Sequence, residues 1–88
     1  MISAEESHER DRFSKKLAAT MLLTRENNHL SKNKLSEICG ISRTAIRMIE
    51  NGDRQPAAAT LFSMARGMKI PLWKIIKQVE EATNRVSK

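Results

Sequence analysis

Arg43, Thr44 and Arg47, near the middle of the chain, have the spacing of residues on one face of a helix. Arginine can donate paired hydrogen bonds to O6 and N7 of guanine, and threonine can reach a base or a phosphate. Met48 lies beside them and could contact a thymine methyl or simply cover the edge of a hydrophobic core. These residue types therefore indicate contact with the bases of double-stranded DNA, and an ordinary solvated surface is the alternative.

Two short helices joined at Gly40 are predicted to position this face. A glycine inside a helix costs about 1 kcal/mol relative to alanine and readily adopts positive φ, so Gly40 is expected to end one helix. Ser31 and Ser42 are favourable N-caps, which predicts helices at 32–39 and 43–50. Apolar residues recur at helical intervals through both segments: Leu35, Ile38, Cys39, Ile46 and Ile49. The pattern at 32–50 is that of a helix-turn-helix, in which the first helix braces the second against a major groove.

Three further helices are predicted around this pair. The first is expected over about residues 9–26, where apolar side chains share one stripe: Phe13, Leu17 and Met21. Another begins at Pro56, after the turn-rich NGDRQP, and ends near Gly67. The last is expected at 71–86, with an apolar stripe along its length: Leu72, Ile75, Ile76, Val79, Thr83 and Val86. Because no strand pattern or internal repeat is visible, the sequence predicts one all-α domain of five helices over residues 1–88.

The charge of the chain favours a polyanionic partner. The formal charge is +6 at pH 7 and the pI is near 10.0. Nucleic acid is the commonest partner for such a protein, and an anionic membrane surface is the second. The aromatic residues Phe13, Phe62 and Trp73 are too scattered to form the stacking platform that binds single strands, so duplex DNA is favoured. No signal peptide or membrane-spanning run is visible, and a cytoplasmic location is predicted.

The residue inventory gives no support for catalysis. Cys39 is the one cysteine, and His8 and His29 do not have metal-ligand spacing with it. The sequence contains no nucleophile and base arrangement, no phosphate-binding glycine loop and no enclosed pair of carboxylates. We therefore predict no enzymatic activity, no metal and no cofactor, with Cys39 as a small buried hydrophobic residue.

The chain resembles the lambda-repressor-like family of Cro and repressor helix-turn-helix regulators, also called the xenobiotic-response-element family. The resemblance covers roughly residues 22–76. It rests on several residues at matching intervals: Arg25, Leu30, Ser31, Leu35, Gly40, Ile41, Ser42, Ile46, Ile49, Glu50, Asn51, Gly52, Pro56, Leu61, Ala65, Met68, Lys69 and Ile70. Three positions depart from the family pattern: Lys32 stands where glutamine is frequent, Ser36 where alanine is usual, and Asp53 where the loop is often basic.

This resemblance implies the roles of several residues. The helix at 43–50 would read bases through Arg43, Thr44, Arg47 and Met48. Arg25 and Glu50 would form a partly buried ion pair that stabilises the fold. Phosphate contacts would come from Lys32, at the start of the first helix of the pair, and from Ser42, Asn51 and Arg54. The partner would be double-stranded DNA.

The length of the last helix suggests a second surface. Its stripe continues beyond what a compact four-helix core needs, which predicts a homodimer interface made by Leu72, Ile75, Ile76, Val79 and Val86. The alternative is that this helix packs back on an extended first helix. The predicted function is a small dimeric transcriptional repressor, with activation as a possible variant. The rival function is an antitoxin-type module that neutralises a protein partner and regulates itself by binding DNA.

Overall fold

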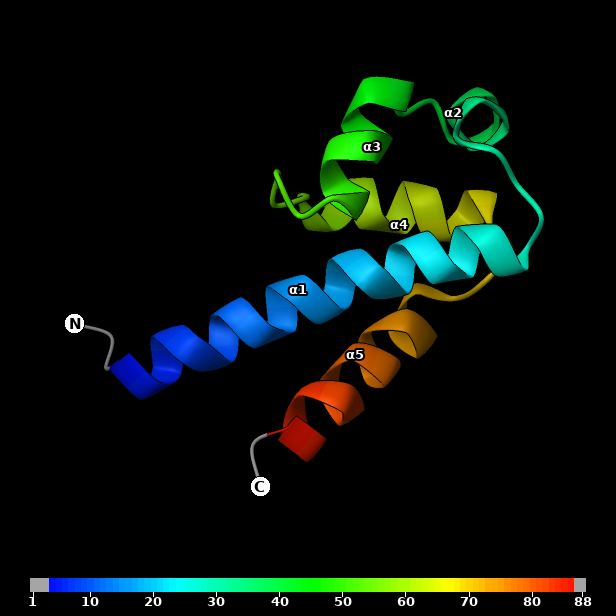
Figure 1. The fold of residues 1–88 in the computed structure, drawn as a ribbon. Coiled ribbons are helices and arrows are strands. Elements are labelled where there is room, and N and C mark those ends of the chain that lie inside the picture. Colours follow the sequence, from blue (N-terminus) through cyan, green and yellow to red (C-terminus); the bar gives the residue numbers. More distant parts are fainter. Residues whose placement is uncertain (1–3, 87–88) are drawn as a thin grey trace.

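The computed structural model describes the backbone of residues 4–86 and the side chains of residues 8–84. Within residues 4–86 the chain forms five helices and no strand: α1 (Ala4–Asn27), α2 (Lys32–Cys39), α3 (Arg43–Glu50), α4 (Ala58–Gly67) and α5 (Leu72–Val86). In Figure 1, α1 crosses the view from lower left to right, with α5 below it and α2, α3 and α4 above it. The predicted all-α fold is confirmed.

All five helices contribute to one hydrophobic core. The largest side chains that are fully buried are Met21, Leu35, Ile46, Met64, Met68, Ile75 and Val79. Methionine is unbranched and flexible, so three methionines can fill the irregular space where the short helices meet the long ones. Cys39 is only half-buried and packs against the edge of this core, so the prediction that it is buried holds in part. None of the helices described here is long and apolar enough to cross a membrane.

The pairing of α1 with α5 corrects the prediction for the last helix. Ile75 and Val79 are fully buried inside the single chain, where they pack in the core cluster with Leu17 and Met21 of α1. Thr83 is also buried, and its hydroxyl donates to the carbonyl oxygen of Val79 at 2.8 Å. Ile75 and Val79 therefore have no surface to offer a second copy, and naming them as dimer contacts was wrong. The stripe packs back on α1, which was the alternative.

The rest of the predicted dimer stripe has a different environment. Leu72 and Ile76 are partly buried against the core and keep some exposed surface at the start of α5. The side chain of Val86 lies outside the described residues. Among the residues predicted for the dimer interface, those with described and partly exposed side chains are therefore Leu72 and Ile76.

The ends of the short helices follow the predicted capping. The hydroxyl of Ser31 accepts a hydrogen bond from the Lys34 N–H at 3.0 Å, and the hydroxyl of Ser42 accepts one from the Ala45 N–H at 3.1 Å. Gly40 has φ 77°, the left-handed conformation that favours glycine, and ends α2 as predicted. By contrast, α1 begins at residue 4 rather than near residue 9, and α4 begins two residues after Pro56.

Within residues 4–86, two non-glycine residues adopt the left-handed conformation, both at helix ends. Lys69 has φ 60° and follows Met68, the C-cap of α4. Its N–H donates to the carbonyl oxygen of Arg66 at 3.0 Å, and the N–H of Ile70 donates to that of Ala65 at 3.0 Å. This is the Schellman arrangement, in which glycine is usual at the left-handed position. His29, with φ 58°, ends α1 in the same way.

A buried ion pair joins α1 to α3. Arg25 Nε donates to Glu50 Oε2 at 2.7 Å, and Arg25 Nη2 donates to Glu50 Oε1 at 3.0 Å. Arg25 Nη1 also donates to the carbonyl oxygen of Leu30 at 2.7 Å. The two side chains are only 7% and 1% exposed. The hydrogen bonds that Arg25 donates to the Glu50 carboxylate raise the pKa of Arg25, against the opposing effect of burial. The structure thus contains the pair expected from the sequence, in its bidentate form.

We expect Glu50→Ala to lower the free energy of unfolding by about 3 to 5 kcal/mol, because Arg25 would keep a buried charge without its partner. Glu50→Gln, which keeps the shape but removes the charge, should also destabilise the fold. Urea denaturation followed by circular dichroism measures the effect. Glu37→Ala is the matched control, since Glu37 is exposed on α2, and it should change stability by less than about 0.5 kcal/mol. Equal unfolding midpoints for Glu50→Ala and Glu37→Ala would contradict the pair's role.

Lys69→Gly should stabilise the protein by about 0.5 to 1 kcal/mol. Relief of the left-handed strain, worth about 1 to 2 kcal/mol, should exceed the added entropy of the unfolded chain, worth about 0.4 to 1 kcal/mol. The control is Lys69→Ala, which removes the same charge and keeps the strain. Thermal unfolding measures both variants, and a stabilisation shared by Lys69→Ala would mean that charge and not backbone strain is responsible.

Candidate nucleic-acid interface

The outer face of α3 carries exposed side chains that can donate hydrogen bonds. Arg43, Thr44 and Arg47 are exposed, whereas Ile46 and Ile49 on the opposite face are buried in the core. Burial of that inner face fixes the helix, so the outer side chains project from a rigid base. The predicted residues are thus brought together on one face that can donate to base edges. Met48 is half-buried beside them, which is compatible with both roles considered for it.

A hollow of about 350 Å³ lies between the end of α1 and the starts of α2 and α3. Lys32 and Arg43 from different helices both line it, beside Arg25, whose charge is paired with Glu50. Asn33, which the sequence interpretation did not name, lines the same hollow and adds an amide donor. Two cations beside the N-terminus of a helix suit an anionic group such as a phosphate. Glu26 is the acidic side chain on its rim.

A second hollow, of about 420 Å³, lies on the other side of α3. Ser42 and Arg54 line it, together with Ala57 and Thr60 at the start of α4. Ala57 is the N-cap of α4 and makes no side-chain hydrogen bond to it, so the first N–H groups of α4 have no side-chain acceptor. These N–H groups are the donors that bind phosphates at helix N-termini. Thr60 and the start of α4 were not predicted from the sequence as candidate site features. The sequence signal for this helix end was the absence of a capping residue before Ala58.

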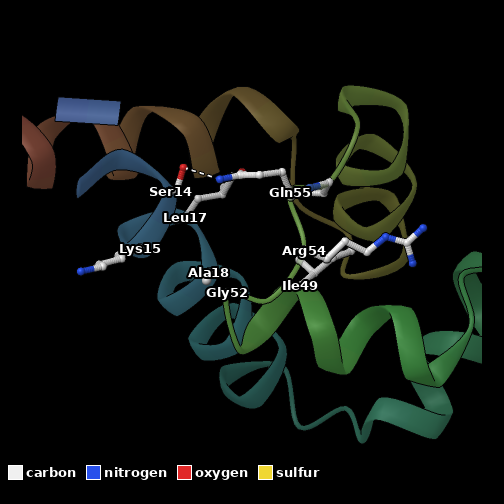
Figure 2. A pocket seen from close by; sticks show the side chains of 9 residues that line it. Ser14, Lys15, Leu17, Ala18, Ile49, Gly52, Arg54 and Gln55 are labelled. Atoms are coloured by element: carbon white, nitrogen blue, oxygen red, sulfur yellow. Dashed lines mark hydrogen bonds between the residues drawn. The ribbon is translucent and has the colours of Figure 1, made fainter. Parts of the chain in front are cut away.

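The loop that carries Arg54 is attached to α1. Gln55 Nε2 donates to the hydroxyl oxygen of Ser14 at 2.7 Å, and this bond borders a cavity of about 50 Å³ (Figure 2). In Figure 2, the Arg54 side chain extends away from Ser14 and Gln55, along the far side of the loop. Gly52, with φ 80°, lets the chain turn sharply where α3 ends. The loop position of Arg54 therefore depends on a contact with α1 that sequence periodicity does not reveal.

The predicted phosphate residues do not all meet at one place. Lys32 lines the first hollow, and Ser42 and Arg54 line the second. Asn51 is the C-cap of α3 and lines neither hollow; its N–H donates to the carbonyl oxygen of Arg47 at 2.9 Å. Asp53, exposed in the following loop, adds a negative charge near Arg54 in sequence. The predicted phosphate residues that line a hollow thus lie on both sides of the N-terminal end of α3.

The site has no feature of a metal centre. Across the described part of the chain, no three His, Cys, Asp or Glu side chains are grouped so that they could hold a metal ion. The chemistry available at α3 and its two hollows is hydrogen bonding and charge neutralisation, which is what recognition of a nucleic-acid duplex requires.

Comparison with known proteins agrees with this geometry. A family described as helix-turn-helix matches residues 23–72, which is more than half of the chain and includes α2, α3 and α4. The chain is also 30% identical over 70 residues to the HTH-type transcriptional regulator SutR of Escherichia coli (strain K12). This match covers 80% of the chain but only 39% of the relative, so the chain spans about two fifths of that protein's length. With its five-helix fold and the two short helices joined at Gly40, the chain belongs to the helix-turn-helix family of the Cro and lambda-repressor type.

Proposed function

We propose that this protein binds a specific sequence of double-stranded DNA and thereby regulates transcription. The observation that carries the proposal is the exposed Arg43, Thr44 and Arg47 face of α3, with a cationic hollow on each side. Membership of the helix-turn-helix family supports it, since members place the second helix of the motif in the major groove. An α-helix with its side chains is about 10 to 12 Å across, and the major groove is about 12 Å wide.

In this arrangement the two hollows orient α3. Lys32 would neutralise a phosphate beside the start of α2, and Arg54 would neutralise one beside the start of α4. Contacts to phosphates fix the position of a protein on DNA, whereas contacts to bases select the sequence. Arg43 and Arg47 would then select guanines through bidentate hydrogen bonds.

A homodimer would strengthen both affinity and specificity. A single module buries only about 600 to 1,000 Å² on DNA, and two modules on one operator double the number of bases read. One apolar surface open to such a contact is at the start of α5, where Ile76 is partly exposed and Trp73 is 62% exposed. These side chains are neighbours on one helix surface. A dimer formed there would repress transcription most simply by occupying a promoter.

Arg43→Ala and Arg47→Ala should each lose about 1 to 3 kcal/mol on the preferred site and relax the preference at one base pair. The preferred site comes from selection among random duplexes, and the affinities come from fluorescence anisotropy. If both variants kept the parent's base preference, α3 would not be the reading helix.

Lys32→Ala should behave differently, because it removes a phosphate contact. Binding to all sequences should weaken by a similar factor, and the slope of log K against log salt should become shallower by about one unit. Lys16→Ala is a matched control, since Lys16 is exposed on α1 and lines neither hollow. A change in base preference without a change in salt slope would reassign Lys32 to base contact.

The dimer is tested with Trp73→Ser. We expect the parent to sediment as a dimer at tens of micromolar and to protect an inverted repeat with half-sites about 10 to 10.5 base pairs apart, or a multiple of that spacing. Trp73→Ser should keep the helical circular dichroism, shift sedimentation toward monomer and weaken operator binding. Leu23→Ser is the control, because Leu23 is equally apolar and 55% exposed, on α1. A monomeric parent that protects one unrepeated half-site would exclude the dimer.

A further inference from the structure

A second apolar surface lies between α2 and α4. Ile38 of α2 is 50% exposed and Phe62 of α4 is 51% exposed, and the two line the same hollow. Between them is a hollow of about 350 Å³, and a second hollow of about 420 Å³ continues past Phe62 toward the start of α5. We call this surface the α2–α4 groove. The residues that line it are Ile38, Cys39, Phe62, Ser63, Arg66, Gly67, Lys69, Ile70, Pro71 and Leu72.

The groove exists because the two helices approach closely at Gly67. A Cβ atom placed on Gly67 would lie 3.0 Å from Leu35 Cδ1 and 3.2 Å from Cys39 Cβ. Because glycine has no side chain here, the end of α4 packs directly on α2. Ile38 and Phe62 line the surface above this contact, and Gly67 lines it with them. Ile38 and Phe62 are therefore held next to a closely packed contact between α2 and α4.

The charge of the groove is positive. Arg66 and Lys69 line it and are exposed, and no acidic side chain lines either hollow. The Arg66 guanidinium lies over the Phe62 ring, 5.7 Å from its centroid, which keeps a cation beside the most exposed apolar wall. An apolar groove with a cationic edge is complementary to a segment that combines apolar and acidic side chains.

The groove is separate from the candidate DNA-binding face along both helices. The DNA-facing features are at the first residues of α2 and α4, near Lys32 and Thr60, whereas the groove involves the last turn of α2 and the stretch of α4 from Phe62 to its end. A second copy of this chain is a poor occupant, because a two-fold contact would bring the Arg66 and Lys69 of each copy together. Like charges placed opposite each other oppose association.

We propose that the α2–α4 groove is a docking site for an acidic amphipathic helix of another protein. Grooves between two helices accept a third helix through apolar anchors one turn apart, and the two hollows on either side of Phe62 offer two such anchor positions. The acidic side chains of the partner then pair with Arg66 and Lys69. This interaction goes beyond DNA binding and does not depend on it.

The test uses the full chain and two labelled probe peptides of identical composition. The first is a helical peptide of about 18 residues in which leucines form one stripe along the helix and glutamates occupy the other positions. The second contains the same residues in a scrambled order that forms no stripe. Fluorescence anisotropy should show at least tenfold tighter binding of the striped peptide. Amide chemical shifts in the NMR spectrum should change at Ile38, Phe62 and Arg66. Equal binding of both peptides would overturn the proposal, because attraction to the overall charge would then suffice.

Variants assign the binding to the groove. Phe62→Ser and Ile38→Ser remove half-exposed side chains without altering the charge, and each should weaken the striped peptide at least tenfold. Arg66→Glu should have a similar effect, while Arg47→Glu makes the same charge change on α3 and should have little. Circular dichroism checks folding, and operator binding should persist in Phe62→Ser. If Phe62→Ser bound the striped peptide with the parent's affinity, the groove would be excluded as the docking site. If Phe62→Ser instead lost self-association and kept peptide binding, the occupant of the groove would be a second copy of this chain.

Discussion

The Arg25–Glu50 ion pair is the interaction on which the position of α3 depends. Glu50 is the last residue of α3, and Arg25 lies near the end of the longest helix, which also packs against α5. The same guanidinium donates to the carbonyl oxygen of Leu30, before α2 begins. One side chain therefore connects α1, the entry to the helix-turn-helix and the end of its second helix. A bidentate pair restricts orientation as well as distance, so α3 is held in rotation as well as in place.

Local signals predicted local structure well. Ser31, Ser42 and Gly40 determine hydrogen bonds within a few residues of themselves, so their roles as caps and corner could be derived from residue type alone. The five helices followed from apolar periodicity. Periodicity does not identify the surface that a stripe meets, however, and this is why Ile75 and Val79 were assigned to a partner chain when they pack against α1.

The parts of the candidate site that escaped prediction depend on contacts between distant residues. Ser14 and Gln55 are 41 residues apart, and neither belongs to a recognisable motif, yet their hydrogen bond attaches the Arg54 loop to α1. Thr60 and the uncapped start of α4 line the same hollow as Ser42, and this proximity cannot be derived from the sequence because it depends on the path of the intervening loop. The family resemblance supplied Arg25 and Glu50, because their pairing reflects a shared fold rather than a sequence interval.

The separation of the two faces of α3 has a consequence for how this protein can diverge. Ile46 and Ile49 hold the helix through its buried face, whereas Arg43, Thr44 and Arg47 are exposed and lie outside the core cluster. Exposed substitutions away from core contacts usually change stability by less than about 0.5 kcal/mol. Descendants of this sequence can therefore exchange those three residues, and with them the base preference proposed for α3, while the scaffold keeps its fold. Paralogues in one genome could acquire separate target genes by this route without first acquiring compensating changes in the core.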